Sequence, residues 1–205
     1  MLTHKALSQH YIAVNKTAKT RLKEFKENGK KITPDEMFME LCFCICTPQS
    51  KAVKVAEVVN KQNIPKLLTL NQDQLAEFLR RNTRFHNNKA RHIINARQYR
   101  KDLGNLPKDG FEAREFIVKN IKGVGYKEAS HYLRNMGYRE LCIIDRHVIN
   151  IMFELGVYDT DKPPATAKKY LEMERILKEY AIKNGFDVDE LDLALWSLKT
   201  GHVFK

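Results

Sequence analysis

The chain has 205 residues, enough for one large domain or two small ones, and its 36 Lys and Arg residues outnumber its 25 Asp and Glu residues, giving a formal net charge of +11. An apolar fraction of 43% argues against a disordered chain. No apolar run approaches the roughly 18 residues that a membrane span needs, and no secretory leader follows Met1. We therefore expect neither a membrane protein nor an exported one.

Helical patterns follow one another along almost the whole chain. The first covers residues 5–28, with Gly29 as the expected stop. A capping box at Thr33–Glu36 opens a second helix, which reaches Cys46 and is apolar nearly all round. Further helices are predicted over residues 52–59, 72–81, 89–103, 111–120, 126–136, 146–155, 166–183 and 190–200. The one strand-like stretch, 141–144, is short enough to be an extended connector, so the sequence predicts an all-α fold.

Positive charge is concentrated in two runs. Eight cations and no acid lie between Arg80 and Lys101, and a second run extends from Lys16 to Lys31. A solvated helix face would explain either run on its own. Two such runs on a chain of this net charge favour a nucleic-acid partner.

Two glycines, Gly123 and Gly125, lie between the helices predicted over 111–120 and 126–136. Glycine permits positive φ and a close approach of the backbone to a ligand, and the free N–H groups at a helix N-terminus suit a phosphate. A Gly-x-Gly pattern alone also fits an ordinary loop. Ile121, Val124 and Ala129 can pack a hairpin between the helices, which favours a helix-hairpin-helix that holds a DNA backbone without reading its sequence.

Lys127 and Asp145 are the candidate catalytic residues. Lys127 lies in the first turn of the second hairpin helix, and its simplest interpretation is a surface lysine. The helix dipole and any partial burial disfavour its charged form, however, and a neutral amine can act as a nucleophile. Asp145 follows an apolar run and precedes a helix, which predicts an N-cap. A carboxylate held there can also meet a developing cation.

Residues Gly123–Lys127 followed by Ile144–His147 resemble the helix-hairpin-helix DNA glycosylase superfamily, with its Gly-x-Gly-x-Lys hairpin and downstream aspartate. Arg84–Ala90 is similar to the segment that precedes the hairpin in those enzymes. Ile117–Asn135 and the tail Glu190–Gly201 are similar to the second family of 8-oxoguanine DNA glycosylases, found mainly in archaea and some bacteria. The resemblance extends from about residue 36 to the end of the chain.

The resemblance implies a two-lobed fold with the active site in the cleft between the lobes. Residues 30–138 would form a central lobe containing the helix-hairpin-helix at about 111–137, and residues 1–29 with 139–205 would form the second lobe. Its implied activity is that of a bifunctional glycosylase and abasic-site lyase that excises 8-oxoguanine. Lys127 would attack C1′ of the flipped nucleotide and form a Schiff base, and Asp145 would stabilise the sugar cation.

Further residues take implied roles in binding DNA and the base. The expected contacts to the DNA backbone come from Gly123, Gly125, Lys122 and Arg146. Phe85 and Trp196 would stack on the damaged base, although core packing also explains a lone tryptophan. Gln49 would fill the vacated stack, where the close family usually has an Ala-Asn pair instead of Pro48-Gln49. The terminal carboxylate of Lys205 would accept the N7 hydrogen that 8-oxoguanine has and guanine lacks.

The cysteines indicate which cofactors to expect. The endonuclease III branch of the superfamily ends in a four-cysteine iron–sulfur loop, but this chain has no cysteine after Cys142. Cys42, Cys44 and Cys46 are best explained as core residues. We therefore expect no cofactor and no metal. The expected partner is double-stranded DNA containing 8-oxoguanine, bound by a monomer near the nucleoid in a prokaryotic cytoplasm.

Two alternatives remain open. One is a glycosylase for another oxidised or alkylated base, which the tail and the missing cluster disfavour. The other is a helix-hairpin-helix module that binds DNA without catalysis. The pairing of Lys127 with Asp145 argues against the module, because simple binding has no use for that spacing.

Overall fold

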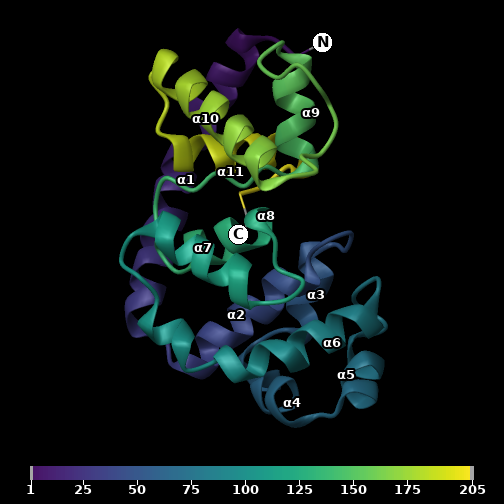
Figure 1. The fold of residues 1–205 in the computed structure, drawn as a ribbon. Helices are drawn as coiled ribbons and strands as arrows, with labels where there is room; N and C mark the ends of the chain where they lie inside the picture. The colour runs from purple at the N-terminus through teal and green to yellow at the C-terminus, as the bar shows by residue number, and fades with distance from the viewer. Residues whose placement is uncertain (1, 204–205) are drawn as a thin grey trace. The chain divides into compact units, whose positions relative to one another are not determined.

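The computed structural model describes residues 2–203, which form α-helices and short 3₁₀ turns with no strand among them (Figure 1). The all-α prediction is confirmed. The chain forms two compact units: Gly29–Tyr132, and the N-terminal residues through Asn28 together with the residues from Leu133 onward. The sequence places the second boundary after residue 138, whereas the units change within the helix that ends at Asn135.

The unit Gly29–Tyr132 is built from short helices around a central one. Its elements are α2 (Pro34–Cys46), α3 (Ala52–Val58), η1 (Lys61–Asn63), α4 (Ile64–Thr69), α5 (Gln72–Leu79), α6 (His86–Ala96), η2 (Arg97–Tyr99), η3 (Asp102–Asn105), α7 (Gly110–Asn120) and most of α8 (Tyr126–Asn135). Helix α2 packs against α3, α4, α6 and η3. Phe38 and Leu41–Cys46 on it are buried, so this helix is the core of the unit.

The other unit contains α1 (His4–Lys31) except its last turn, α9 (Arg146–Glu154), α10 (Ala167–Lys183) and α11 (Val188–Thr200). Helix α11 packs against both α9 and α10. Ala18, Leu22 and Phe25 of α1 form a buried cluster with Leu193 of α11. The first and last helices of the chain therefore share one core.

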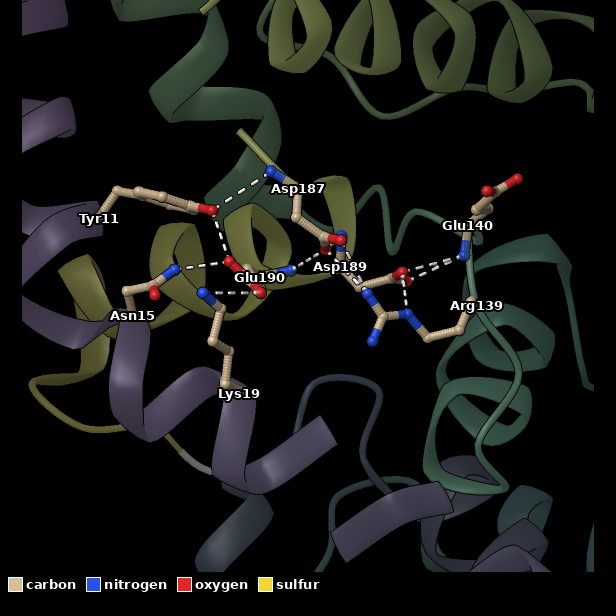
Figure 2. Close-up of polar contacts among 8 residues, drawn as sticks. All are labelled: Tyr11, Asn15, Lys19, Arg139, Glu140, Asp187, Asp189 and Glu190. Carbon is tan, nitrogen blue, oxygen red and sulfur yellow. Dashed lines mark hydrogen bonds and ion pairs between the residues drawn. The ribbon is translucent and has the colours of Figure 1, made fainter. Parts of the chain in front are cut away.

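A set of acidic side chains at the start of α11 joins it to α1 and to the segment after α8 (Figure 2). Glu190 accepts a hydrogen bond of 2.6 Å from the hydroxyl of Tyr11, and burial together with this bond raises the pKa of Tyr11 to about 12. The remaining contacts of this set involve Asn15, Lys19, Arg139, Glu140, Asp187 and Asp189. These bonds fix α11 within its unit.

Three local predictions are confirmed at atomic level. Thr33 forms the predicted reciprocal capping box with Glu36, and the structure shows a second such box between Asn71 and Gln74. Cys42, Cys44 and Cys46 are buried, so their interpretation as core residues is confirmed, and burial raises the pKa of the Cys46 thiol to about 12. The stretch 141–144 is extended without pairing as a strand.

Two predicted helices have wrong boundaries. Helix α1 continues through Gly29 to Lys31, because a single glycine costs a helix interior only about 1 kcal/mol. The helix predicted over 89–103 begins at His86 and ends at Ala96, and the following residues form two 3₁₀ turns. There the guanidinium of Arg97 donates to the carbonyls of Leu67 and Leu70, which are tertiary bonds that a local pattern does not encode.

Candidate active site and DNA-contacting loops

The hairpin between α7 and α8 has a backbone that requires glycine at one position. Gly123 has φ +85°, and a Cβ built there would lie 2.4 Å from the ring of His92. Ile121, Val124 and Ala129 are buried, as a packed hairpin requires. Gly123 is exposed on its other side, so its main chain is available to a ligand.

Arg114 fastens the two hairpin helices together. It is 1% exposed on α7 and donates to the hydroxyl of Ser130 on α8 at 3.1 Å. Its guanidinium also lies 5.3 Å from the centre of the Tyr126 ring, whose hydroxyl donates to Glu115 of α7 at 2.7 Å. These residues are not among the site residues predicted from the sequence. The sequence signal that could have identified Arg114 is its position as a cation on an otherwise apolar face of the helix.

Lys127 lies in the first turn of α8, with its side chain 26% exposed. Its Nζ atom is 3.2 Å from Oε1 of Glu128. The amine is therefore partly sheltered and still reachable from solvent, a setting in which a nucleophile can meet a substrate. Glu128 is the acidic partner that the sequence analysis missed.

Asp145 is the N-cap of α9, as predicted, because its Oδ1 accepts from the amide of Val148 at 2.9 Å. Its own amide donates to the carbonyl of Ile143. Arg146 follows as the first residue of α9 and is exposed. A carboxylate and an exposed cation thus begin the same helix.

The extended segment that leads to Asp145 is held by side chains. The amide of Cys142 donates to Glu174 of α10 at 2.9 Å, and the amide of Ile143 donates to Asp192 of α11 at 3.2 Å. The amide of Ile144 donates to the hydroxyl of Tyr170 at 3.2 Å. Buried main-chain donors require partners, and here α10 and α11 supply them in place of a neighbouring strand. The tail helix therefore sets the position of Asp145.

Asp192 is the central acid of this arrangement. It is 3% exposed and forms an ion pair with Arg134, which is equally buried at the end of α8. Burial raises the pKa of Asp192 to about 6; Arg134 opposes this shift, and the neighbouring carboxylate of Asp145 adds to it. This places Asp145 within electrostatic reach of Asp192.

Gln49 and Phe85 occupy exposed loops of the unit Gly29–Tyr132. Gln49 lies after the end of α2 with φ +55°, and Phe85 precedes α6 with φ +57°. Phe85 is 52% exposed, and the guanidinium of Arg84 lies 5.7 Å from its ring centre. Both side chains are thus available to a ligand.

The cation run between Arg80 and Lys101 is only partly a charged surface. Arg80 pairs with Glu77, and Arg100 pairs with Asp35. Lys89 is buried, and the partly buried Arg97 donates to the carbonyls of Leu67 and Leu70. The exposed members outside these contacts are Arg81, Arg84, Arg91 and Lys101. Lys89 and Arg97 therefore serve the fold, and a contact between the exposed members of the run and a nucleic acid stays a prediction.

Trp196 is partly buried on α11, and its ring meets that of His202 edge-on at 5.7 Å between centroids. The helix ends at Gly201, as predicted. Val203 then packs against the cluster formed by α1 and Leu193. Lys205 lies outside the described residues.

Comparison with known proteins identifies the family. A family model for 8-oxoguanine DNA glycosylase matches residues 18–186. The chain belongs to this family. It is 39% identical to the 8-oxoguanine DNA glycosylase/AP lyase of Fusobacterium nucleatum, over 98% of this chain and 94% of that protein.

Two solved structures of family members resemble this chain closely. The glycosylase of Thermotoga maritima has a TM-score of 0.91 and 35% identity, with 98% of this chain and 97% of that one covered. The glycosylase/lyase of Methanocaldococcus jannaschii, in complex with 15-mer DNA containing 8-oxoguanine, has a TM-score of 0.83 and 38% identity, covering 94% and 93%. The resemblance drawn from the hairpin and tail motifs is therefore confirmed. Within residues 2–203, no helix has the length and apolar character needed to cross a membrane.

Proposed function

We propose that this chain excises 8-oxoguanine from double-stranded DNA and then cleaves the strand at the resulting abasic site. The observation that carries the proposal is the lysine in the first turn after a glycine hairpin, in a chain with a capped aspartate and near full-length similarity to proteins named 8-oxoguanine DNA glycosylase/AP lyase. The protein would act as a monomer in the cytoplasm of a prokaryote.

Lys127 is the proposed nucleophile. Its neutral amine attacks C1′, the bond from C1′ to the base breaks, and the base leaves with the bonding electrons and takes up a proton. The sugar ring then opens as the nitrogen loses a proton and forms an imine with C1′. Loss of a proton from C2′ allows β-elimination, which breaks the C3′–O bond and releases the 3′ phosphate. Asp145 stabilises the positive charge that develops at the sugar.

The DNA backbone is bound at two helix starts in this proposal. The amides around Gly123 and Gly125, with Lys122 beside them, hold one phosphate at the start of α8. Arg146 at the start of α9 contacts the backbone through its guanidinium. All four of these residues are exposed.

Base selection is assigned to aromatic stacking and one carboxylate. Phe85 and Trp196 stack on the flipped purine, and Gln49 occupies the space that the purine leaves. The α-carboxylate of Lys205 accepts the N7 hydrogen of 8-oxoguanine. Guanine offers a lone pair at N7, which repels the carboxylate, so this contact discriminates strongly.

Reductive trapping with borohydride tests the proposal. The wild type should form covalent protein–DNA adducts on duplexes carrying 8-oxoguanine and not on undamaged duplexes, and Lys127→Gln should form none. Lys119→Gln is the matched control, because Lys119 is an exposed lysine on α7 outside the proposed machinery. Trapping only on a different damaged base would favour a glycosylase of other specificity. DNA binding without any adduct would favour a non-catalytic module.

A further inference from the structure

Two exposed loops of the unit Gly29–Tyr132 hold a non-glycine residue in the left-handed backbone region. These residues are Gln49 and Phe85, with φ of +55° and +57°. Amide and aromatic side chains of this kind rarely adopt such φ values, and they persist there only where the surroundings force the conformation. We therefore expect buried groups beneath the two loops to hold these backbone conformations in place.

Lys89 lies beneath the first loop and reaches both sides of Gln49. It is 5% exposed, and its Nζ donates to the carbonyl of Cys46 at 2.7 Å and to that of Pro48 at 2.8 Å. The same ammonium donates to the hydroxyl of Ser50 at 2.8 Å. Residues on both flanks of Gln49 are thus bonded to one buried cation.

The same group also reaches the second loop. Lys89 donates to the hydroxyl of Thr83 at 2.6 Å, and the hydroxyls of Thr83 and Ser50 lie 3.0 Å apart. The amide of Arg84 donates to Ser50 at 2.9 Å, immediately before Phe85. Lys89, Ser50 and Thr83, here called the Lys89 hub, therefore join the two loops into one polar cluster.

Fold stability alone does not explain a lysine here. None of the four acceptors around its ammonium is a carboxylate, and an ammonium buried among neutral groups has a large desolvation cost. Burial, together with the nearby cations Lys127 and Arg84, lowers the pKa of Lys89 to about 8, against an opposing effect of Cys46. The four acceptor oxygens surround one ammonium group that can donate to several of them at once. This arrangement points to a role for Lys89 in fixing the geometry of the two loops.

We propose that Lys89 is a positioning residue that holds Gln49 and Phe85 as one rigid pair for extrusion and capture of the damaged base. This inference rests on the proposed function. It assigns to Lys89 no contact with DNA. Its effect is confined to steps in which a base must leave the stack, because the loops have no part in the chemistry at C1′.

The test compares two substrates for Lys89→Met, which keeps the side-chain length and removes the donors. Single-turnover excision from a duplex with 8-oxoguanine should fall about 10- to 100-fold, since misplacement by about 1 Å can cost on the order of 100-fold. Borohydride trapping on a duplex with a preformed abasic site should change less than about threefold, because no base remains to be extruded. Lys119→Met is the matched control, because Lys119 is an exposed lysine of the same unit outside the proposed machinery and its replacement should leave both rates unchanged.

A coupling experiment separates positioning from general damage to the fold. In a background of Gln49→Ala with Phe85→Ala, adding Lys89→Met should have little further effect on excision, because the residues it positions are gone. Thr83→Val provides a milder disruption of the hub and should show the same preference for the 8-oxoguanine substrate. Hydrogen exchange should show faster exchange at the amides of residues 47–51 and 83–86 in Lys89→Met, with the helices still protected.

Several results would overturn the inference. Equal losses on both substrates, an undiminished effect of Lys89→Met in the double-alanine background, or unchanged exchange in both loops would each do so. Absence of trapping by the wild type on either substrate would overturn the proposed function itself, whereas wild-type trapping with no selective loss in Lys89→Met overturns only the role of the hub.

Discussion

Replacing Gly123 with alanine should damage the hairpin through two separable effects. The backbone there has φ +85°, and an L residue in a left-handed conformation costs about 1–2 kcal/mol. The new Cβ would also meet the ring of His92 at 2.4 Å, and overpacking of this kind costs about 1–3 kcal/mol. We expect Gly123→Ala to lower the free energy of unfolding by about 2–5 kcal/mol.

The assay is urea unfolding combined with a double-mutant cycle. Gly104→Ala is the control, because a Cβ at Gly104 meets nothing within 4 Å and should have little effect. Adding His92→Ala to Gly123→Ala removes the clash and should recover about 1–3 kcal/mol, leaving the backbone strain. Affinity for undamaged duplex should fall about 10- to 30-fold in Gly123→Ala, the equivalent of one or two lost main-chain bonds to phosphate. Wild-type stability in Gly123→Ala, or no coupling between the two positions, would refute this account of the hairpin.

Four further predictions concern charge and the chain terminus. Asp145→Asn keeps a cap-competent side chain, so stability should change by roughly 1 kcal/mol or less while base excision collapses; near-normal excision would leave only the capping role. Arg81→Gln and Arg84→Gln should each reduce the slope of log affinity against log salt by about one, whereas Arg97→Gln should lower stability and leave that slope unchanged. The pKa of Lys89 is about 8 in the folded state, below the ordinary 10.5, so the folded protein loses this proton at a lower pH than the unfolded chain does. The free energy of unfolding of the wild type should therefore rise between pH 8 and 10 relative to that of Lys89→Met. Parallel pH profiles of the two proteins would contradict this. Deleting Lys205 should reduce 8-oxoguanine excision far more than general DNA affinity, and unchanged discrimination against guanine would move selectivity elsewhere.

Local chemistry made part of this fold predictable. The caps at Thr33, Asn71 and Asp145 each depend on residues within three positions, so the sequence shows both partners together. The hairpin also follows from a short pattern, because Gly123 is required by its own φ and by one neighbour. The residues that determine the caps lie within a few positions of them in the sequence, and the glycine pattern of the hairpin is equally local.

Long-range bonding made the rest unpredictable. Lys89 and Arg97 look like members of a basic surface, but most of their hydrogen-bond partners lie 27 to 43 positions away in the sequence. The segment before Asp145 looks like a strand because its residues are apolar, yet its amides bond to Glu174 and Asp192. Neither set of long-range hydrogen bonds produces a periodic pattern in the sequence.

Lys127 is the residue proposed to form the covalent bond to DNA. The most direct measurement is reductive trapping of the wild type on an 8-oxoguanine duplex, followed by nuclease digestion and peptide mapping by mass spectrometry. The sugar remnant should be attached to Lys127 alone. Attachment to another amine, such as Lys122 or Lys89, with Lys127 unmodified, would contradict it.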